Sequence, residues 1–401
     1  GGAGLVAVVG SGLMGSVSGS AVANTVSTGV ITIPMMKKSG FPSRFSAGVV
    51  AAASTGGALM PPVMGAGAFV LASYTQISYL TIIAASTLPA VLYFLTVSYF
   101  VRIEAKRLGL TPANSGDTEQ VSTVLKEGWH FIIPISILVS FLVVGRTPTT
   151  SAAFAIISVI GASWLSSTPM LPKDIFNAVV DGVKTMVSTA LLLIAVGIII
   201  NVVTTTGVGN AFSLMIVEWA QGSLLITLIL VALASLVLGM GLPVTASYIV
   251  LATLSAPLIF DLITQSQLLA VLQEGNLPSN VAATIGLFGG DPLIALQEMP
   301  LEMKQIIRQE MLEPELLTGM LLSAHLIIFW LSQDSNVTPP VCLASFAAAG
   351  IAGTRPIATG LTSWKVAKGL YLVPVLFAYS PLISGSWPER LEVFLWSCMG
   401  L

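Results

Sequence analysis

The stretch Gly15–Thr25, GSVSGSAVANT, lies inside an apolar sequence but consists largely of small and polar residues. A span that faces lipid would carry leucine and isoleucine here, because the hydrocarbon core offers polar groups no partners. An interrupted backbone survives at membrane depth only where protein or a water-filled cavity covers it. The stretch therefore predicts a break in a membrane helix and, with it, a binding site.

The composition places the chain in a membrane. Of its 401 residues, 55% are hydrophobic and only 8% are charged, and the mean hydropathy is +0.92. No soluble globular domain of this length has such values, so we expect an all-α polytopic membrane protein. The two cysteines are too few for a disulfide framework. The chain begins at Gly1 without a targeting segment, and we expect further sequence before it.

Two short apolar legs flank the opening stretch. Gly4–Met14 and Val26–Met36 each supply about half of the ~20 residues that a full span requires. Two such legs around a polar tip predict a re-entrant hairpin, which enters and leaves the membrane on one side. The alternative is a single span with a small-residue packing face, and we favour the hairpin.

The next crossing is interrupted at Ser54–Pro62, STGGALMPP, because two prolines remove backbone donors and two glycines add freedom. The same order of features recurs later in the chain. A second polar tip at Gly239–Ser247, GMGLPVTAS, precedes a leg with Pro257 and a span broken at Ser332–Pro340, SQDSNVTPP. The two halves become comparable in length once the polar segment Asp261–Pro314 is set aside. The sequence therefore predicts an internal repeat with two hairpins and two broken spans.

The repeat divides the chain into four segments. Residues 1–101 form the first repeat and residues 102–222 a connecting loop with scaffold or arm helices. Residues 223–383 form the second repeat, and residues 384–401 begin a span that the end of the chain truncates. Within the second repeat, residues 261–314 are predicted to be a solvated insertion with short amphipathic helices.

Basic residues favour the cytoplasmic side of a membrane. When Lys37, Lys38 and Arg44 are placed inside and crossings are counted, the first hairpin opens to the cytoplasm. The second hairpin and the insertion then open to the opposite side, which is an inverted-topology repeat. Eleven of the sixteen basic residues are cytoplasmic on this count: Lys37, Lys38, Arg44, Arg102, Lys106, Arg107, Lys126, Lys173, Arg355, Lys365 and Lys368.

Broken helices carry the predicted chemistry. Unwound carbonyls and helix C-termini suit a hard cation such as Na⁺, whereas helix N-termini favour an anionic group. For any single serine or threonine, a hydroxyl bonded to its own helix is the simpler interpretation, so the prediction depends on the pattern occurring twice. Asp334 is an acidic exception, and a proton role for it stays open.

The first sodium site is predicted from Ser18, Ser20 and Asn24 with the backbone of Thr55, Gly56 and Gly57, and the second from Thr245, Ser247, Asn336 and Thr338. A substrate between the two tips would contact Ser16, Ser18, Gly19, Thr245 and Ala246. No catalytic residue is predicted, because His130 and His325 stand alone in sequence and no paired metal-ligand motif or phosphate-binding loop is present.

Four long motifs resemble the large membrane subunit of tripartite ATP-independent periplasmic (TRAP) transporters. They are GSVSGSAVANTVSTGVITIPMMKKSGF at 15–41, AAASTGGALMPPVMGAGAFVLA at 51–72, LGMGLPVTASYIVLATLSAPL at 238–258 and SNVTPPVCLASFAAAGIAGTRPIATG at 335–360. Within the family, the sequence is most similar to the fused permeases that work with TAXI-type binding proteins. Residues 261–314 fall outside the resemblance.

The resemblance implies a sodium-driven, elevator-type importer of organic acids in the bacterial inner membrane, with a scaffold domain and a moving transport domain. It implies a periplasmic TAXI-type substrate-binding protein as partner, and a small membrane subunit or equivalent N-terminal helices. The lipid bilayer surrounds the chain, and no nucleic acid is involved.

Two other functions stay open at this point. A sodium/dicarboxylate carrier with similar hairpins would need no binding protein. A channel or a non-transporting membrane scaffold is the alternative from a different class. The insertion also has two interpretations, a tolerated surface excursion, which we favour, and a contact for the binding protein.

Overall fold

The computed structural model describes residues 1–110, 128–166, 169–275 and 277–401, and all regular elements within these ranges are helices. The predicted all-α fold is thereby confirmed. Among the described residues, four helical segments are long and apolar enough to cross a membrane: α5 Tyr79–Arg107, α9 Pro172–Thr206, α12 Val244–Gln273, and Pro314–Asn336, which joins α16 to η3.

The first repeat begins with two helices packed as a hairpin, α1 Gly2–Ser18 and α2 Ala21–Lys38. The chain reverses at Gly19, whose φ of +62° favours glycine, and the Ser20 side chain caps α2. Only these two residues lie outside helix, so the break falls within the predicted stretch Gly15–Thr25 but is confined to its middle. The other small residues of the stretch remain helical and keep their backbone hydrogen bonds. Their small side chains allow α3 to pack closely against both helices.

The broken span of this repeat consists of α3 Ser43–Gly57 and α4 Ala66–Thr75. Residues 58–65 between them form an irregular loop, so the interruption starts four residues later than predicted at Ser54 and extends beyond Pro62. The helix persists through Ser54–Gly57 because its first disruptive residues are the prolines themselves.

The second repeat has the same order of elements. Helices α11 Leu224–Gly239 and α12 pack as a hairpin around the turn 240–243. The broken span consists of α16 Pro314–Leu331, η3 Ser332–Asn336, an irregular stretch at 337–342 and α17 Leu343–Ala352. The tip is again shorter than predicted, since Thr245 and Ser247 belong to the start of α12.

The two loops share a backbone feature. Met64 and Cys342 each lie two residues after the second proline, and both have positive φ, +58° and +33°. Positive φ is uncommon for residues other than glycine. Its occurrence at the same position in both halves supports the predicted repeat.

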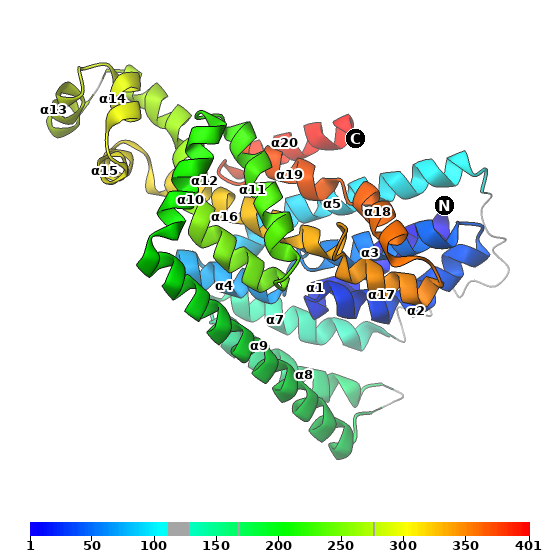
Figure 1. Cartoon of the computed structure of the whole chain (residues 1–401). Coiled ribbons are helices and arrows are strands. Elements are labelled where there is room, and N and C mark those ends of the chain that lie inside the picture. Colours follow the sequence, from blue (N-terminus) through cyan, green and yellow to red (C-terminus); the bar gives the residue numbers. More distant parts are fainter. Residues whose placement is uncertain (111–127, 167–168, 276) are drawn as a thin grey trace.

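The two repeats interlock in a common bundle (Figure 1). Helices α17 and α18 pack against α3, while α4 of the first repeat packs against α12 and α16 of the second. The chain after the broken span continues as α18 Pro356–Val366, which the sequence analysis did not predict, α19 Gly369–Tyr379 and α20 Trp387–Gly400.

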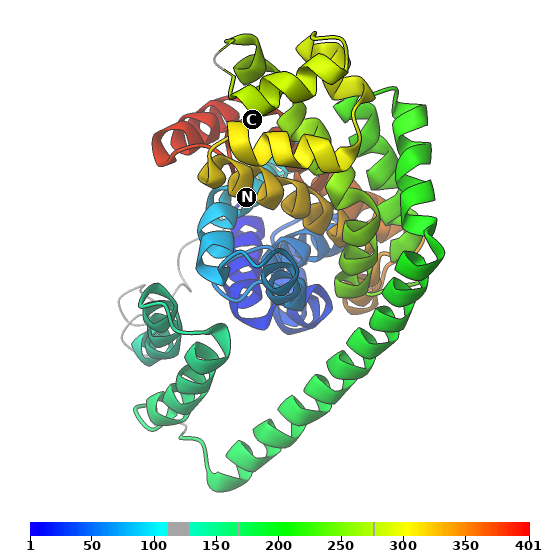
Figure 2. The same cartoon turned by 90° about the vertical axis from the view of Figure 1, so that its left-hand side faces the viewer.

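The segment between the repeats lies at the periphery of this bundle. Helices α7 Ile132–Val143 and α8 Pro148–Ser163 pack against each other, after a short turn η2 Trp129–Phe131. The long helix α9 runs obliquely beside the bundle before α10 Val208–Ala220 returns to it (Figure 2). Only 6% of the apolar window of α9 is buried inside the chain, so most of this helix is available to lipid or to other protein.

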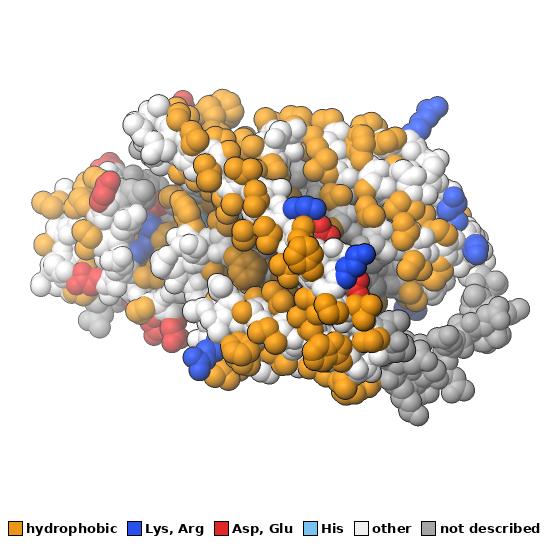
Figure 3. Space-filling model, turned by 90° about the horizontal axis from the view of Figure 1, so that it is seen from below, with side chains coloured by type: hydrophobic (Ala, Val, Ile, Leu, Met, Phe, Trp, Pro, Cys, Tyr) orange, Lys and Arg blue, Asp and Glu red, His pale blue; other side chains and the backbone are white. Residues whose placement is uncertain are grey.

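The charged ends of the molecule are opposite each other. Lys37 and Lys38 end α2, Lys106 and Arg107 end α5, and these helix ends lie across the molecule from the insertion helices (Figure 1). Apolar side chains cover much of the face between the two ends (Figure 3). The charge count predicts that the first of these ends faces the cytoplasm and that the insertion lies on the other side of the membrane.

The insertion contains three short helices, α13 Ser279–Leu287, α14 Pro292–Glu298 and α15 Leu301–Met311. Helix α12 does not end before Asp261, as the segment boundaries predicted, but continues to Gln273 and joins the insertion core. That core consists of Leu268, Leu272, Val281, Ile285, Ala295, Leu296, Met299, Ile307 and Leu312.

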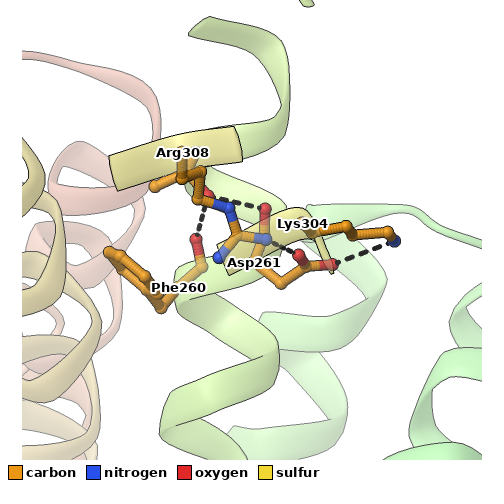
Figure 4. Close-up of polar contacts among 5 residues, drawn as sticks. Phe260, Asp261, Lys304 and Arg308 are labelled. Carbon is orange, nitrogen blue, oxygen red and sulfur yellow. Dashed lines mark hydrogen bonds and ion pairs between the residues drawn. The ribbon is translucent and has the colours of Figure 1, made fainter. Parts of the chain in front are cut away.

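A partly buried ion-pair network fastens the insertion to α12 (Figure 4). The Arg308 guanidinium donates to Asp261 Oδ1, and Lys304 Nζ lies 3.8 Å from Asp261 Oδ2. The Arg308 guanidinium also lies over the Phe260 ring, 5.3 Å from its centroid. Burial lowers the pKa of Arg308 from its ordinary value, while Asp261 acts in the opposite direction. Asp261 thus compensates two cations from α15 at once.

Replacement of Asp261 by asparagine should loosen the insertion. The change leaves Arg308, which is 3% exposed, without its anion, and losing one partner of a buried pair typically costs about 3–5 kcal/mol. Amide hydrogen exchange in α15 should therefore accelerate by at least about 100-fold. Glu302→Gln is the matched control, because Glu302 is exposed on the same helix. Equal exchange in both variants would show that the network does not hold the insertion.

Candidate ion and substrate site

The first hairpin tip is seated on the loop of the first broken span. The Val63 N–H donates to the Ser16 carbonyl at 3.1 Å. Gly19 packs so closely against Met64 and Gly65 that a Cβ at Gly19 would collide with the Met64 carbonyl. Tip and loop therefore form one unit, through residues 63–65 of the loop.

Asn24 lies fully buried where α1, α2 and the end of α3 meet. Its Nδ2 donates to the Ser11 carbonyl at 2.7 Å, and the Thr28 hydroxyl lies 3.5 Å from its Oδ1. A Cβ built on Gly57 would lie 2.6 Å from Asn24 Nδ2 and 2.7 Å from the Gly15 Cα. The structure thus brings Asn24 and the α3 C-terminus together.

The other oxygens predicted for the first site divide into two groups. The Thr55 hydroxyl donates to Ala51 in its own helix, and Ser20 is exposed and caps α2. The carbonyls of Thr55, Gly56 and Gly57 already accept turn hydrogen bonds from residues 58–60, which leaves each oxygen its second lone pair. Ser18 Oγ and Ser54 Oγ are buried without a partner among the described residues. Ser54 was not predicted as a ligand, because nothing in the local sequence distinguishes it from the neighbouring small and polar residues.

The second hairpin is seated in the same way. Gly239 packs against Ser335, and all five residues of η3 are buried. Gly57 and Ser335 occupy the same position, four residues before the first proline of each pair. The same contact between a hairpin glycine and a broken span therefore occurs in both repeats.

The predicted oxygens of the second site are only partly free. Asn336 Nδ2 donates to Gln333 Oε1 at 3.3 Å, and the Thr338 hydroxyl pairs with the Tyr371 hydroxyl at 2.7 Å. Ser247 Oγ is buried without a partner in the described part of the chain. Tyr371 was not predicted, because a tyrosine in an apolar span carries no local signal of the contact it makes across helices.

The start of α12 suits an anionic group. Its first turn contains Thr245 and Ala246, and the preceding Pro243 provides no side-chain cap. Uncapped N–H groups and the helix dipole favour a carboxylate at such an end. At the first tip, Ser20 caps α2 and the Ser16 hydroxyl donates to Leu13, so the first tip offers fewer free donors than predicted.

Residues 1–383 match the family described as "Tripartite ATP-independent periplasmic transporter, DctM component". The chain belongs to this family. This TRAP-family chain is 24% identical to the 2,3-diketo-L-gulonate TRAP transporter large permease protein YiaN of Escherichia coli, over 65% of the chain and 60% of that protein. It is 25% identical to the C4-dicarboxylate TRAP transporter large permease protein DctM of Pseudomonas aeruginosa, over 65% of the chain and 61% of that protein.

The family confirms the resemblance noted in the sequence, and by its description it contains transporters rather than enzymes. Together with the membrane-length helices, it makes the TRAP-family chain a multi-pass protein of the bacterial inner membrane. The chain spans about 60% of the length of the curated relatives that it matches. The TAXI-type branch stays a prediction.

Proposed function

We propose that the chain is the membrane domain of a sodium-coupled importer of organic acids. A periplasmic substrate-binding protein of the TAXI type delivers the organic acid to it. The observation that carries the proposal is the equivalent seating of two hairpin tips on two broken spans, at Gly15 on Gly57 and at Gly239 on Ser335. Broken helices facing one another in inverted repeats are typical of ion-coupled transporters. The names of both relatives above specify organic acids, which supports that class of substrate.

In the proposed cycle, sodium orders both tips before the substrate binds. Asn24, Ser18 and the α3 carbonyls hold one ion, while Thr245, Ser247, Asn336 and Thr338 hold the other. A substrate carboxylate then docks between the tips, at the uncapped start of α12. Coupling follows because the ordered tips bind substrate more tightly than the disordered ones.

Helices α7, α8 and α9 are the candidates for the static arms of an elevator. They lie at the periphery of the interlocked bundle, and α9 exposes most of its apolar surface (Figure 2). The interlocked hairpins and broken spans are then the moving body. A rigid body that carries its site across the membrane needs such a separation from its scaffold.

Uptake of labelled organic acids into proteoliposomes tests the function. The complete protein that contains this chain is reconstituted with any small subunit, with and without the cognate binding protein and a sodium gradient. We expect uptake that saturates and requires both. Sodium-independent uptake would refute the coupling, uptake without binding protein would favour the simpler carrier, and current that does not saturate would favour a channel.

Two substitutions should weaken sodium activation. Asn24→Ala removes the buried amide of the first site and Thr245→Ala a hydroxyl of the second, and each should raise the half-saturating sodium concentration at least about 10-fold. Ser20→Ala is the control, because Ser20 is exposed and its hydroxyl caps its own helix. Normal activation in both test variants would contradict the assignment of the sites.

A further inference from the structure

The two broken spans cross over between the repeats. The first half of each span packs against its own hairpin, since α3 lies against α1 and α2, and α16 lies against α11 and α12. The second half packs against the other repeat, since α4 lies against α12 and α16, and α17 lies against α2 and α3. Each hairpin is therefore in contact with both broken spans.

Helix α4 starts directly after the loop on which the first tip is seated. In this loop, Val63 bonds to the Ser16 carbonyl, and Met64 packs against Gly19. Only one residue separates Met64 from the start of α4 at Ala66. A displacement of the first tip therefore reaches α4 through a short stretch of backbone.

Gly67 brings α4 into direct contact with the second repeat. It is buried in the first turn of α4, and a Cβ built on it would lie 2.6 Å from the Phe329 ring of α16. Phe329 is 0% exposed, and its ring meets the Tyr248 ring edge-on with the centroids 5.6 Å apart. Tyr248 lies one turn after the first residue of α12, which begins at the second tip. Close-packed side chains of this kind transmit strain, so a shift of α4 reaches the second tip.

A buried hydrogen bond holds Tyr248 in this contact. The Tyr248 hydroxyl and His325 Nδ1 lie 3.1 Å apart, and both side chains are buried. His325 lies four residues before Phe329, on the same face of α16, and its ring centroid is 5.5 Å from that of Tyr74 in α4. Losing one partner of a buried hydrogen bond leaves the other unsatisfied, which is costly. The bond therefore fixes the orientation of the Tyr248 ring against Phe329.

The equivalent crossing in the first hairpin is made differently. Counted from the proline of each hairpin's second leg, the residue that corresponds to Tyr248 is Thr25, whose hydroxyl donates within its own helix. The second repeat reaches this hairpin through Ile351 of α17, whose Cδ1 would lie 3.2 Å from a Cβ built on Gly29. The end of an isoleucine side chain can rotate, whereas the buried rings beside α4 are enclosed. The crossing through α4 is thus the stiffer one.

We propose that the contact among Gly67, Phe329, Tyr248 and His325 couples the two hairpin tips, so that the seating of one tip favours the seating of the other. The coupling itself rests on these contacts, and its consequence for sodium rests on the proposed function. His325 is a positioning residue, because it acts on the second tip through Tyr248. An ion that orders one tip then raises the affinity of the other tip for its ion.

Amide hydrogen exchange in the purified complete protein tests the coupling without sodium or substrate. Gly19→Ala unseats the first tip, because the added Cβ collides with the Met64 carbonyl. Exchange at residues 240–248 of the second tip should then accelerate at least about 5-fold, the lower end of typical coupling between sites. In the Gly67→Ala background, where α4 is pushed away from Phe329, Gly19→Ala should still accelerate exchange at the first tip but no longer at the second.

Gly350→Ala is the matched control for Gly67→Ala. Gly350 lies in α17, the equivalent helix of the second repeat, and no atom of the described residues lies within 4 Å of a Cβ added there. The effect of Gly19→Ala on the second tip should persist in this background. Tyr248→Phe, which removes only the hydroxyl, and Phe329→Leu, which removes the ring, should abolish that effect. These two backgrounds decide the question where Gly67→Ala does not fold.

Unchanged exchange at residues 240–248 in Gly19→Ala would overturn the inference, because the tips would then be independent. An effect that persists in the Gly67→Ala, Tyr248→Phe and Phe329→Leu backgrounds would overturn it as well, since the coupling would run through other contacts. In proteoliposomes, sodium activation should be cooperative in wild type and lose its cooperativity in Tyr248→Phe. Uptake that needs no sodium would refute the proposed function, while the exchange result would still decide the coupling.

Discussion

Gly57→Ala should destabilise the protein by about 3 kcal/mol. The added methyl would lie 2.7 Å from the Gly15 Cα and 2.6 Å from Asn24 Nδ2. The first of these atoms is backbone, so no rotation of a side chain relieves the clash, and α1 must move away from α3. The measurement is the midpoint of thermal unfolding of the detergent-solubilised protein, which should fall. Sodium activation should weaken with it, because the same shift displaces Asn24.

Gly10→Ala is the matched control for this change. Gly10 also lies within α1, but nothing lies within 4 Å of a Cβ added there. Alanine is favoured over glycine in a helix by roughly 0.5–1 kcal/mol, so this variant should be as stable as wild type or slightly more stable. A similar loss of stability in both variants would show that the effect of Gly57→Ala does not come from the contact between α1 and α3.

Gly239→Ala should destabilise the second hairpin by about 1–3 kcal/mol, and Ser335→Gly should restore it. The new Cβ would lie 2.7 Å from the Cβ of Ser335, which is a side-chain atom that the second substitution removes. The two changes should therefore be strongly non-additive. Unfolding midpoints of the two single variants and the double variant form the cycle that measures the coupling.

Additive effects in that cycle would contradict the seating of the second tip on η3. Ser335→Gly by itself should have a small effect, because the Ser335 hydroxyl donates only a 3.3 Å hydrogen bond within its own turn. The opposite outcome, a large loss from Ser335→Gly, would indicate that this hydroxyl is a ligand. Sodium binding to the single variant separates the two explanations.

The order of elements could be predicted from the sequence, because proline pairs and small-residue tips disturb an apolar pattern visibly. The lengths of the tips and of the irregular loops could not be predicted. Ser54–Gly57 and Thr245–Ser247 look like loop residues, yet they continue helices. Buried serine, threonine and glycine are tolerated in membrane helices where neighbouring helices pack closely, and this packing is not visible in a local stretch.

For the same reason, only part of the candidate site could be predicted from the sequence. Asn24 stood out as an amide among small residues, and the structure places it at the junction of three helices. Ser20 stood out equally, but it lies at the exposed outer side of the turn. Tyr371 and Trp364 reach the second site from α19 and α18, far along the chain. Such contacts depend on how the repeats interlock, which no single segment encodes.

Helix α12 continues without interruption from Val244 at the second tip to Gln273 in the insertion. Thirty residues of helix span about 45 Å, and the Asp261 network joins the far end to α15. The insertion is thus joined to the second hairpin tip by one continuous helix. On the proposed function, a displacement of the insertion would be transmitted along α12 to the second tip without a change in any residue of the proposed site.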